Sequence, residues 1–141
     1  MIELEACDRL IKFATIGNAG IQALISGRSY SDEAPLGTAF PVIISSVQTT
    51  SDDLVVNDGP NVVRTDLDYL IKVVTRTREQ SYVEAYALMR LVHASLSNVA
   101  ISGPYNIAGV YRNGSVIRYR ENIDGAYFNH VGAPYRFVGT G

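Results

Sequence analysis

The sequence lacks the residues and motifs that identify several large classes of protein. It has one cysteine, Cys7, which excludes a disulfide framework and a zinc site built from cysteines. It has no run of about 18 apolar residues, so we expect no membrane-spanning segment. Its acidic start, Met1–Glu5, is unlike a secretory signal, which predicts synthesis in the cytoplasm. The phosphate-binding patterns GxxxxGKS/T and GxGxxG are both missing.

Reactive side chains are also few. Cys7 falls on the apolar stripe of a predicted helix, where a buried and inert thiol is expected. The two histidines, His93 and His130, have no serine, cysteine or acidic partner at a recognisable motif spacing and make a weak case for a metal. The carboxylate pair Asp52-Asp53 is typical of a solvated loop. We therefore expect no enzyme activity, no metal and no cofactor.

The charge is small in total but unevenly distributed. The length of 141 residues and the hydrophobic content of 47% predict a single globular domain over residues 1–141, and the net charge of −2 argues against a general nucleic-acid binder. Residues 1–70 carry 4 Lys/Arg and 10 Asp/Glu (−6), whereas residues 71–141 carry 8 and 4 (+4). Faces of opposite charge favour a head-to-tail ring, unless the two halves interleave in space.

Two helices and one short helical segment are predicted. Apolar spacing indicates a helix over Ile2–Ala14, followed by a short helical segment at Ala19–Ser26. The main helix is expected over Gln80–Leu96, with Ser81 and Glu84 as a capping box. Its apolar surface is wider than one sheet would cover, so the helix either lies in a tight core or meets a neighbouring subunit.

The strands are expected over Phe40–Thr50, Thr65–Thr77 and Tyr127–Val138, and their order with the helices indicates an α+β fold with one largely antiparallel sheet packed against the main helix and the N-terminal helix. In the second strand, alternation points a core-facing set inward. In the third, Gly132 and Pro134 suggest a bulge or an edge position. The core-facing set is Leu67, Tyr69, Ile71 and Val73.

Two turn regions lie between these strands. Asn113-Gly114, between Ala108–Arg112 and Ser115–Arg120, predicts a two-residue type I′ hairpin. The stretch Ser51–Arg64 is expected to be an acidic loop that projects from the body, toward the channel of a ring or onto an axial face.

Arginines and aromatic residues alternate near the C-terminal end. Arg118 and Arg120 share one face of their strand, which leaves Ile117 and Tyr119 pointing to the core. This pattern fits either ordinary cross-strand pairs or a stacking surface for single-stranded nucleic acid. A third interpretation is that the arginines contact carboxylates of another subunit. The candidate interface residues are therefore Asp52, Asp53, Asp58, Asp66, Asp68, Arg118 and Arg120.

One stretch resembles a known family. Gly27–Ile44 reads GRSYSDEAPLGTAFPVII, in which a helix leads to Gly-Arg-aromatic, then to Ala-Pro-Leu-Gly, and then to a proline that opens a strand. This pattern resembles the tail-completion or tail-terminator proteins of tailed phages. The N-terminal helix, the strand and helix from Leu67 onward, and the closing strand extend the resemblance over nearly the whole chain.

The resemblance implies a structural virion protein at the tail–neck junction. Its partners would be further copies of itself in a hexameric ring, the tail tube protein that the ring caps, and a neck or connector protein, with DNA only as passing cargo. Another head–tail connector is the alternative in the same class. A small single-strand nucleic-acid-binding module is the alternative from a different class.

Overall fold

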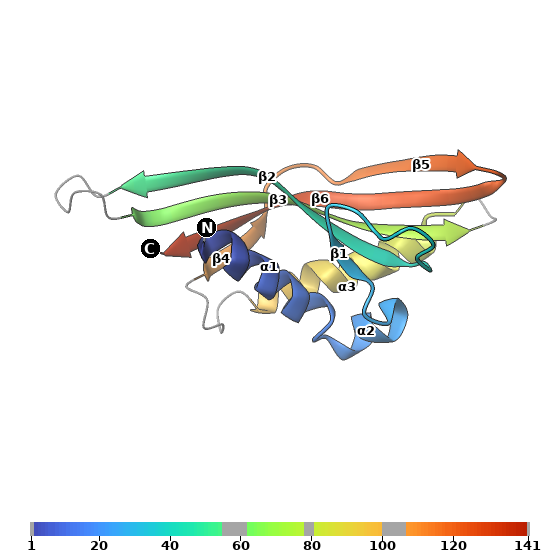
Figure 1. The fold of residues 1–141 in the computed structure, drawn as a ribbon, viewed down its shortest axis with the longest axis horizontal. Helices are drawn as coiled ribbons and strands as arrows, with labels where there is room; N and C mark the ends of the chain where they lie inside the picture. The colour runs from blue at the N-terminus through green and yellow to red at the C-terminus, as the bar shows by residue number, and fades with distance from the viewer. Residues whose placement is uncertain (1, 55–61, 78–80, 100–106, 141) are drawn as a thin grey trace.

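The computed structural model describes residues 2–54, 62–77, 81–99 and 107–140. These residues form three helices and six strands, in an α+β arrangement (Figure 1). In chain order the elements are α1 (Ile2–Thr15), α2 (Ala19–Ile25), β1 (Ser29–Ser31), β2 (Val42–Leu54), β3 (Val62–Thr77), α3 (Val83–Val99), β4 (Ile107–Arg112), β5 (Ile117–Ile123) and β6 (Ala126–Thr140).

All six strands belong to one sheet. The strand order is β1-β2-β3-β6-β4, and β5 also pairs with β6. Every pairing is antiparallel except the short parallel one between β1 and β2. The three helices lie on one side of this sheet, which we call the inner face (Figure 1). The predicted fold class, a largely antiparallel sheet packed against a main helix and an N-terminal helix, is confirmed.

The core lies between the inner face and the helices. The alternation predicted for β3 is confirmed, because Leu67, Tyr69, Ile71 and Val73 are all buried there. Burying one such side chain contributes about 1.5–3 kcal/mol to folding. The other buried residues of this core include Leu10 and Ile11 of α1, Leu88 and Val92 of α3, and Val131, Tyr135 and Phe137 of β6.

Polar contacts hold the helices to each other. Ser95 on α3 donates a hydrogen bond to the carbonyl of Ala14 at the end of α1, over 2.6 Å. Asn18 caps α2 by accepting from the Ile21 N–H, and its amide also donates to Ser95. α1 ends at Thr15, close to the predicted end at Ala14, and a Cβ on Gly17 would lie 2.4 Å from the Phe13 carbonyl oxygen.

The main helix begins slightly later than predicted. Its first residue is Val83, and the Tyr86 N–H bonds the carbonyl of Tyr82. The hydroxyl of Ser81 accepts a hydrogen bond from the Val83 N–H at 3.3 Å. Ser81 therefore stabilises the first turn from the position that precedes the N-cap.

The predicted acidic loop is wrong at both ends. β2 continues to Leu54 and β3 begins at Val62, with Asp52 paired with Thr65 and Asp53 with Arg64. The predicted turn around Asn57–Pro60 lies outside the described residues. Strand-forming residues on either side of Asp52-Asp53 continue the pairing of β2 with β3 through these two positions. The aspartates alone had indicated a loop. The paired ends of β2 and β3, which we call the arm (residues 51–54 and 62–64), extend beyond the helices (Figure 1).

The predicted hairpin at Asn113-Gly114 is also wrong. β4 and β5 do not pair with each other; both pair with β6, one after the other. The hairpin turn lies instead at Asp124-Gly125, where φ is 51° and 82°, as a type I′ turn requires. An Asp-Gly pair is a signal of the same strength as Asn-Gly, so local sequence could have placed this turn.

β6 is an interior strand and not an edge. It pairs with β3 on one side and with β4 and β5 on the other. Pro134 is tolerated because its carbonyl accepts from the Asn113 N–H, in the interval where β4 has ended and β5 has not begun. Its nitrogen points into the same interval, so no ladder bond is lost.

Candidate assembly surface

Arg118 and Arg120 lie on the inner face of the sheet. In β5, Arg118 is opposite Val131 and Arg120 is opposite Asn129, and Val131 belongs to the core. The prediction that both arginines share a face is therefore confirmed, but that face is the helix side.

The prediction that Ile117 and Tyr119 point to the core is wrong. These two side chains are 39% and 42% exposed. Tyr119 stacks instead on His130, with ring centroids 4.1 Å apart, on the outer face. The physical reason is that β5 is an edge strand beside the start of α3. Its inner face is covered by Tyr82, which precedes α3, and by Tyr86 of α3, and not by an apolar core.

Both arginines contact aromatic rings. Arg118 donates a 2.6 Å hydrogen bond to the Tyr86 hydroxyl, and its guanidinium carbon lies 4.9 Å from the Tyr82 ring centroid. Arg120 lies 4.5 Å from the same ring and 5.4 Å from that of Tyr127. We call these five residues the arginine–tyrosine cluster. Stacked guanidinium groups keep their charge while losing rotamer freedom, which suits a contact surface.

Hydrogen bonds fix the cluster from behind. The Arg120 Nε donates to the Asn129 side-chain oxygen at 2.7 Å, and the Asn129 amide donates to the carbonyl of Ser81 at 2.9 Å. The bond to Tyr86 raises the pKa of Arg118 above its usual value. The alternation in β5 was the sequence signal that placed Arg118 and Arg120 on one face. Tyr82 and Tyr86 could not be assigned to the cluster without the tertiary structure.

A second group lies on the outer face behind the cluster. The Lys72 Nζ donates to the Tyr119 hydroxyl at 3.1 Å, and the His130 Nε2 lies 2.6 Å from a carboxylate oxygen of Glu121. Burial and the charge of Lys72 lower the pKa of His130, and they outweigh the attraction of Glu121. His130 is therefore neutral in the folded protein near neutral pH.

Asp68 already has a partner within the chain. Arg136, its cross-strand neighbour on β6, donates to its two carboxylate oxygens at 2.8 and 3.0 Å. This ion pair is bidentate and lies on the outer face. Hydrogen bonds to Asp68 and Tyr111 raise the pKa of Arg136. Asp66 precedes Asp68 by two residues in β3, opposite Val138.

Three candidates remain, and the structure describes two of them. Asp52 and Asp53 are paired residues of β2. Asp58 lies outside the described residues. The structure thus separates the acidic candidates from the two arginines: β2 is two strands away from β6, and β5 pairs on the far side of β6.

A groove lies beside the arginine–tyrosine cluster, between α3 and the interval that separates β4 from β5. Its cavity measures about 270 Å³. The floor is apolar and buried, whereas Arg90, Arg112 and His93 at the rim are exposed. The His93 Nδ1 is hydrogen-bonded to the Tyr135 hydroxyl at 2.9 Å. The remaining lining residues are Tyr86, Met89, Val116, Val131 and Ala133.

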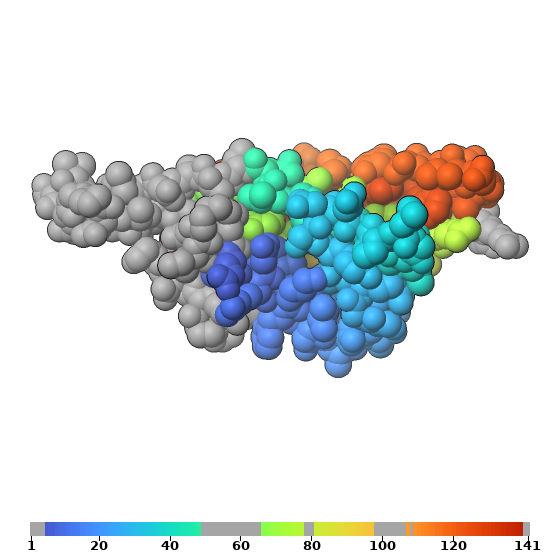
Figure 2. Space-filling model, viewed as in Figure 1, coloured from blue at the N-terminus to red at the C-terminus, as the bar shows by residue number. Residues whose placement is uncertain are grey.

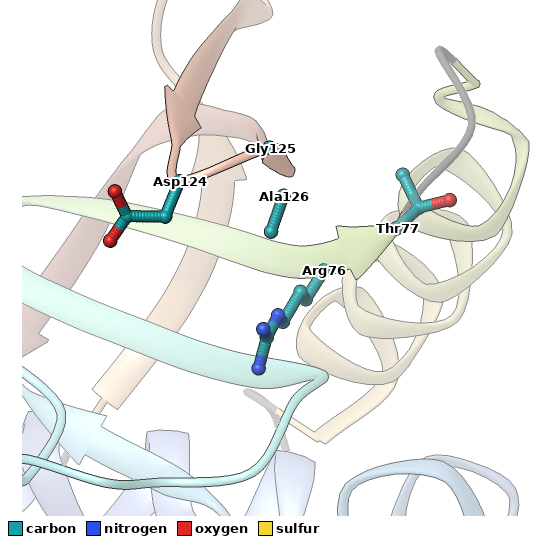
Figure 3. Close-up of a pocket in the computed structure, with 5 residues that line it drawn as sticks. All are labelled: Arg76, Thr77, Asp124, Gly125 and Ala126. Carbon is teal, nitrogen blue, oxygen red and sulfur yellow. The ribbon is translucent and has the colours of Figure 1, made fainter.

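A larger cavity of about 520 Å³ lies at the C-terminal end of β3 (Figure 3). Arg76 and Thr77 line it together with the turn residues Asp124 and Gly125 and with Ala126. The Arg76 guanidinium and the Asp124 carboxylate do not converge on a common point in it (Figure 3).

Residues suited to catalysis or metal binding are dispersed. His93 lies on α3, on the inner side of the sheet, whereas His130 lies on the outer face. Cys7 is fully buried in the core, as predicted. Across residues 2–54, 62–77, 81–99 and 107–140, no three His, Cys, Asp or Glu side chains gather where a metal could bind. No helix in this part of the chain is long and apolar enough to span a membrane.

Comparison with solved structures supports the fold. A chain from the virion of a native gene transfer agent particle superposes with a TM-score of 0.61 at 15% identity, over 93% of this chain and 92% of that one. A second solved chain gives a TM-score of 0.56 at 10% identity, over 96% and 93%. No curated protein matches.

Comparison with protein families is more specific. The family described as "Tail completion protein gp17" matches residues 14–128. This match contains Gly27–Ile44, the stretch on which the resemblance rests, and it confirms that resemblance. Because it covers most of the chain, the protein belongs to the tail completion protein gp17 family and is a virion-associated structural protein of phage tails.

Proposed function

We propose that the protein forms a hexameric ring at the end of the tail tube and joins the tube to a neck or connector protein at the tail–neck junction. Family membership supports a role in completing the tail. The protein would act through complementary surfaces and not as an enzyme, with DNA only as passing cargo.

The observation that carries the ring is the separation of charge across the sheet. β1, β2 and β3 come from residues 29–77, whereas β6, β4 and β5 come from residues 107–140, and these two groups occupy opposite sides in the strand order. Residues 29–77 carry 3 Lys/Arg and 7 Asp/Glu (−4), whereas residues 107–140 carry 4 and 2 (+2). The two groups do not alternate across the sheet, so an acidic side of one copy can meet a basic side of the next.

The shape of the molecule also supports a heterologous contact. The arm extends past the helices at one end of the sheet (Figure 1). The β5–β6 hairpin forms the upper rim at the opposite end (Figures 1 and 2). Different surfaces at the two ends produce a ring when the rotation between copies closes. We propose that the arm, with Asp52 and Asp53, and the arginine–tyrosine cluster belong to such contacts.

Changing Arg118 and Arg120 to Glu tests the role of that cluster. Arg118 is exposed and Arg120 is half-buried outside the apolar core, so the variant should fold while its ring formation weakens. Far-UV circular dichroism checks folding and native mass spectrometry checks assembly. A normal ring from the folded double variant would remove the cluster from the interface.

The joining role can be tested during particle assembly. Without this protein, heads and tails should accumulate separately, and adding the purified protein should restore joined particles. Electron microscopy would count the joined particles in both samples. Normal joining without the protein would contradict the proposed function.

Binding of single-stranded nucleic acid remains the second candidate, because arginines and tyrosines gather on β5 and α3. The contacts oppose it, since Arg118 and Arg120 already lie over the Tyr82 ring and compete with base stacking there. Salt-sensitive oligonucleotide binding by a monomeric protein, lost when both arginines are changed, would favour this alternative.

A further inference from the structure

The groove beside α3 has properties that fit a protein segment better than a small ligand. Its volume of about 270 Å³ lies just below the range of about 300–1,000 Å³ that is usual for small-molecule sites. Its floor is apolar, with Met89, Val131 and Ala133 almost fully buried. A groove of this size accommodates one or two side chains of a docked segment.

The rim selects the charge of that segment. Arg90, Arg112 and His93 line the groove, and its lining contains no acidic residue. Arg118 is hydrogen-bonded to Tyr86, which also lines the groove, so a fourth basic group lies nearby. The complementary partner is an extended segment that carries an apolar side chain beside a carboxylate.

The chain itself contains such a segment. We propose that the groove of one copy receives the end of β2, Ser51–Leu54, from a second copy. This segment reads Ser-Asp-Asp-Leu and belongs to the arm, which extends beyond the helices (Figure 1). β1 pairs with β2 only as far as Ser45, so in the described part of the chain no strand covers that edge of β2 at the arm. The inference rests on the proposed ring and identifies one of its contacts.

The topology makes this contact run from copy to copy in one direction. The end of β2 and the groove lie on opposite sides of β3 in the sheet, so the two surfaces of the contact are different. Contacts between two different surfaces are heterologous, and they form a ring when the rotation between copies closes.

Charge reversal tests the groove. Changing Arg90 and Arg112 to Glu should raise the protein concentration needed for half-maximal ring formation about tenfold or more, because two like charges would then face Asp52. Arg9→Glu is the matched control for Arg90→Glu, since Arg9 is also an exposed helical arginine and its ion pair is with Glu5 of the same helix. Analytical ultracentrifugation measures assembly, and the control should assemble like the wild type.

Charge restoration identifies the occupant. In the Arg90→Glu, Arg112→Glu background, changing both Asp52 and Asp53 to Arg should restore assembly, whereas changing Glu5 and Glu33, two exposed acids outside the arm, should not. Equal assembly of the wild type and the Arg90→Glu, Arg112→Glu variant would overturn this inference and leave the proposed ring standing. A wild-type protein that forms no ring, alone or with tail tube protein, would overturn both.

Discussion

Gly132 shows how closely β3 and β6 approach each other. A Cβ on Gly132 would lie 2.6 Å from the Lys72 Cβ and 2.7 Å from the Ile71 carbonyl oxygen. Because the obstacle includes backbone, Gly132→Ala should separate the strands and lower the free energy of unfolding by about 2 kcal/mol. Gly109→Ala in β4 is the control, since no atom lies within 4 Å of its Cβ position. Chemical denaturation of both variants checks this; equal stabilities would contradict it.

His130 should make stability depend on pH below neutrality. Its pKa in the folded protein lies below the usual 6.5, mainly because of burial. The unfolded chain therefore binds more protons than the folded chain as the pH falls through this range, and the free energy of unfolding should decrease from about pH 7 to about pH 5. His130→Gln should show a shallower decrease in urea titrations at each pH. An identical pH dependence would exclude His130 as the cause.

Sequence alone predicted single residues well where one local rule decides their position. Alternation placed Leu67 to Val73 on the core side of β3, and apolar spacing placed Cys7 in the core. The alternation in β5 correctly placed Arg118 and Arg120 on one face. It assigned the wrong face to the core, because Tyr82 and Tyr86 cover the inner face of β5. The pair Asp68–Arg136 depends on the register between β3 and β6, which no local pattern contains.

At the scale of elements, the β5–β6 hairpin depends on its two-residue turn. Asp124 and Gly125 both have positive φ, which glycine and, to a lesser degree, aspartate and asparagine tolerate. Gly125→Val should lower the free energy of unfolding by about 1–2 kcal/mol. Asp124→Asn keeps a residue that tolerates this backbone and should be nearly neutral. Thermal unfolding compares them, and a neutral Gly125→Val would show that the turn does not constrain the hairpin.

The helices and the long strands were predictable as elements, because their periodic patterns are long. The predicted hairpin at Asn113-Gly114 and the predicted loop at Ser51–Arg64 were wrong for the same reason. In each case a local turn signal lies in a stretch that pairs with a neighbouring strand. Asn113-Gly114 interrupts one long partner of β6 and does not reverse the chain, and a Cβ on Gly114 would lie 2.6 Å from the Pro134 side chain. Asp52-Asp53 lies within β2, although its acidic side chains indicated a loop. Pairing with Thr65 and Arg64 satisfies the backbone groups of these two residues.

At the scale of the whole molecule, the strand order places two oppositely charged parts of the sequence on opposite sides of the sheet. The side formed by β1, β2 and β3 comes from residues 29–77, which are net acidic, and the side formed by β6, β4 and β5 comes from residues 107–140, which are net basic. If copies associate head to tail as proposed, their attraction should weaken with salt because exposed charges are screened. The family match agrees with a role in completing a phage tail.

The mass of the assembled protein, measured by native mass spectrometry alone and with tail tube protein, tests the central claim most directly. We expect a single species with the mass of six copies, either free or bound to tube ends, and its amount should fall as the salt concentration rises. A monomer under both conditions would contradict the account.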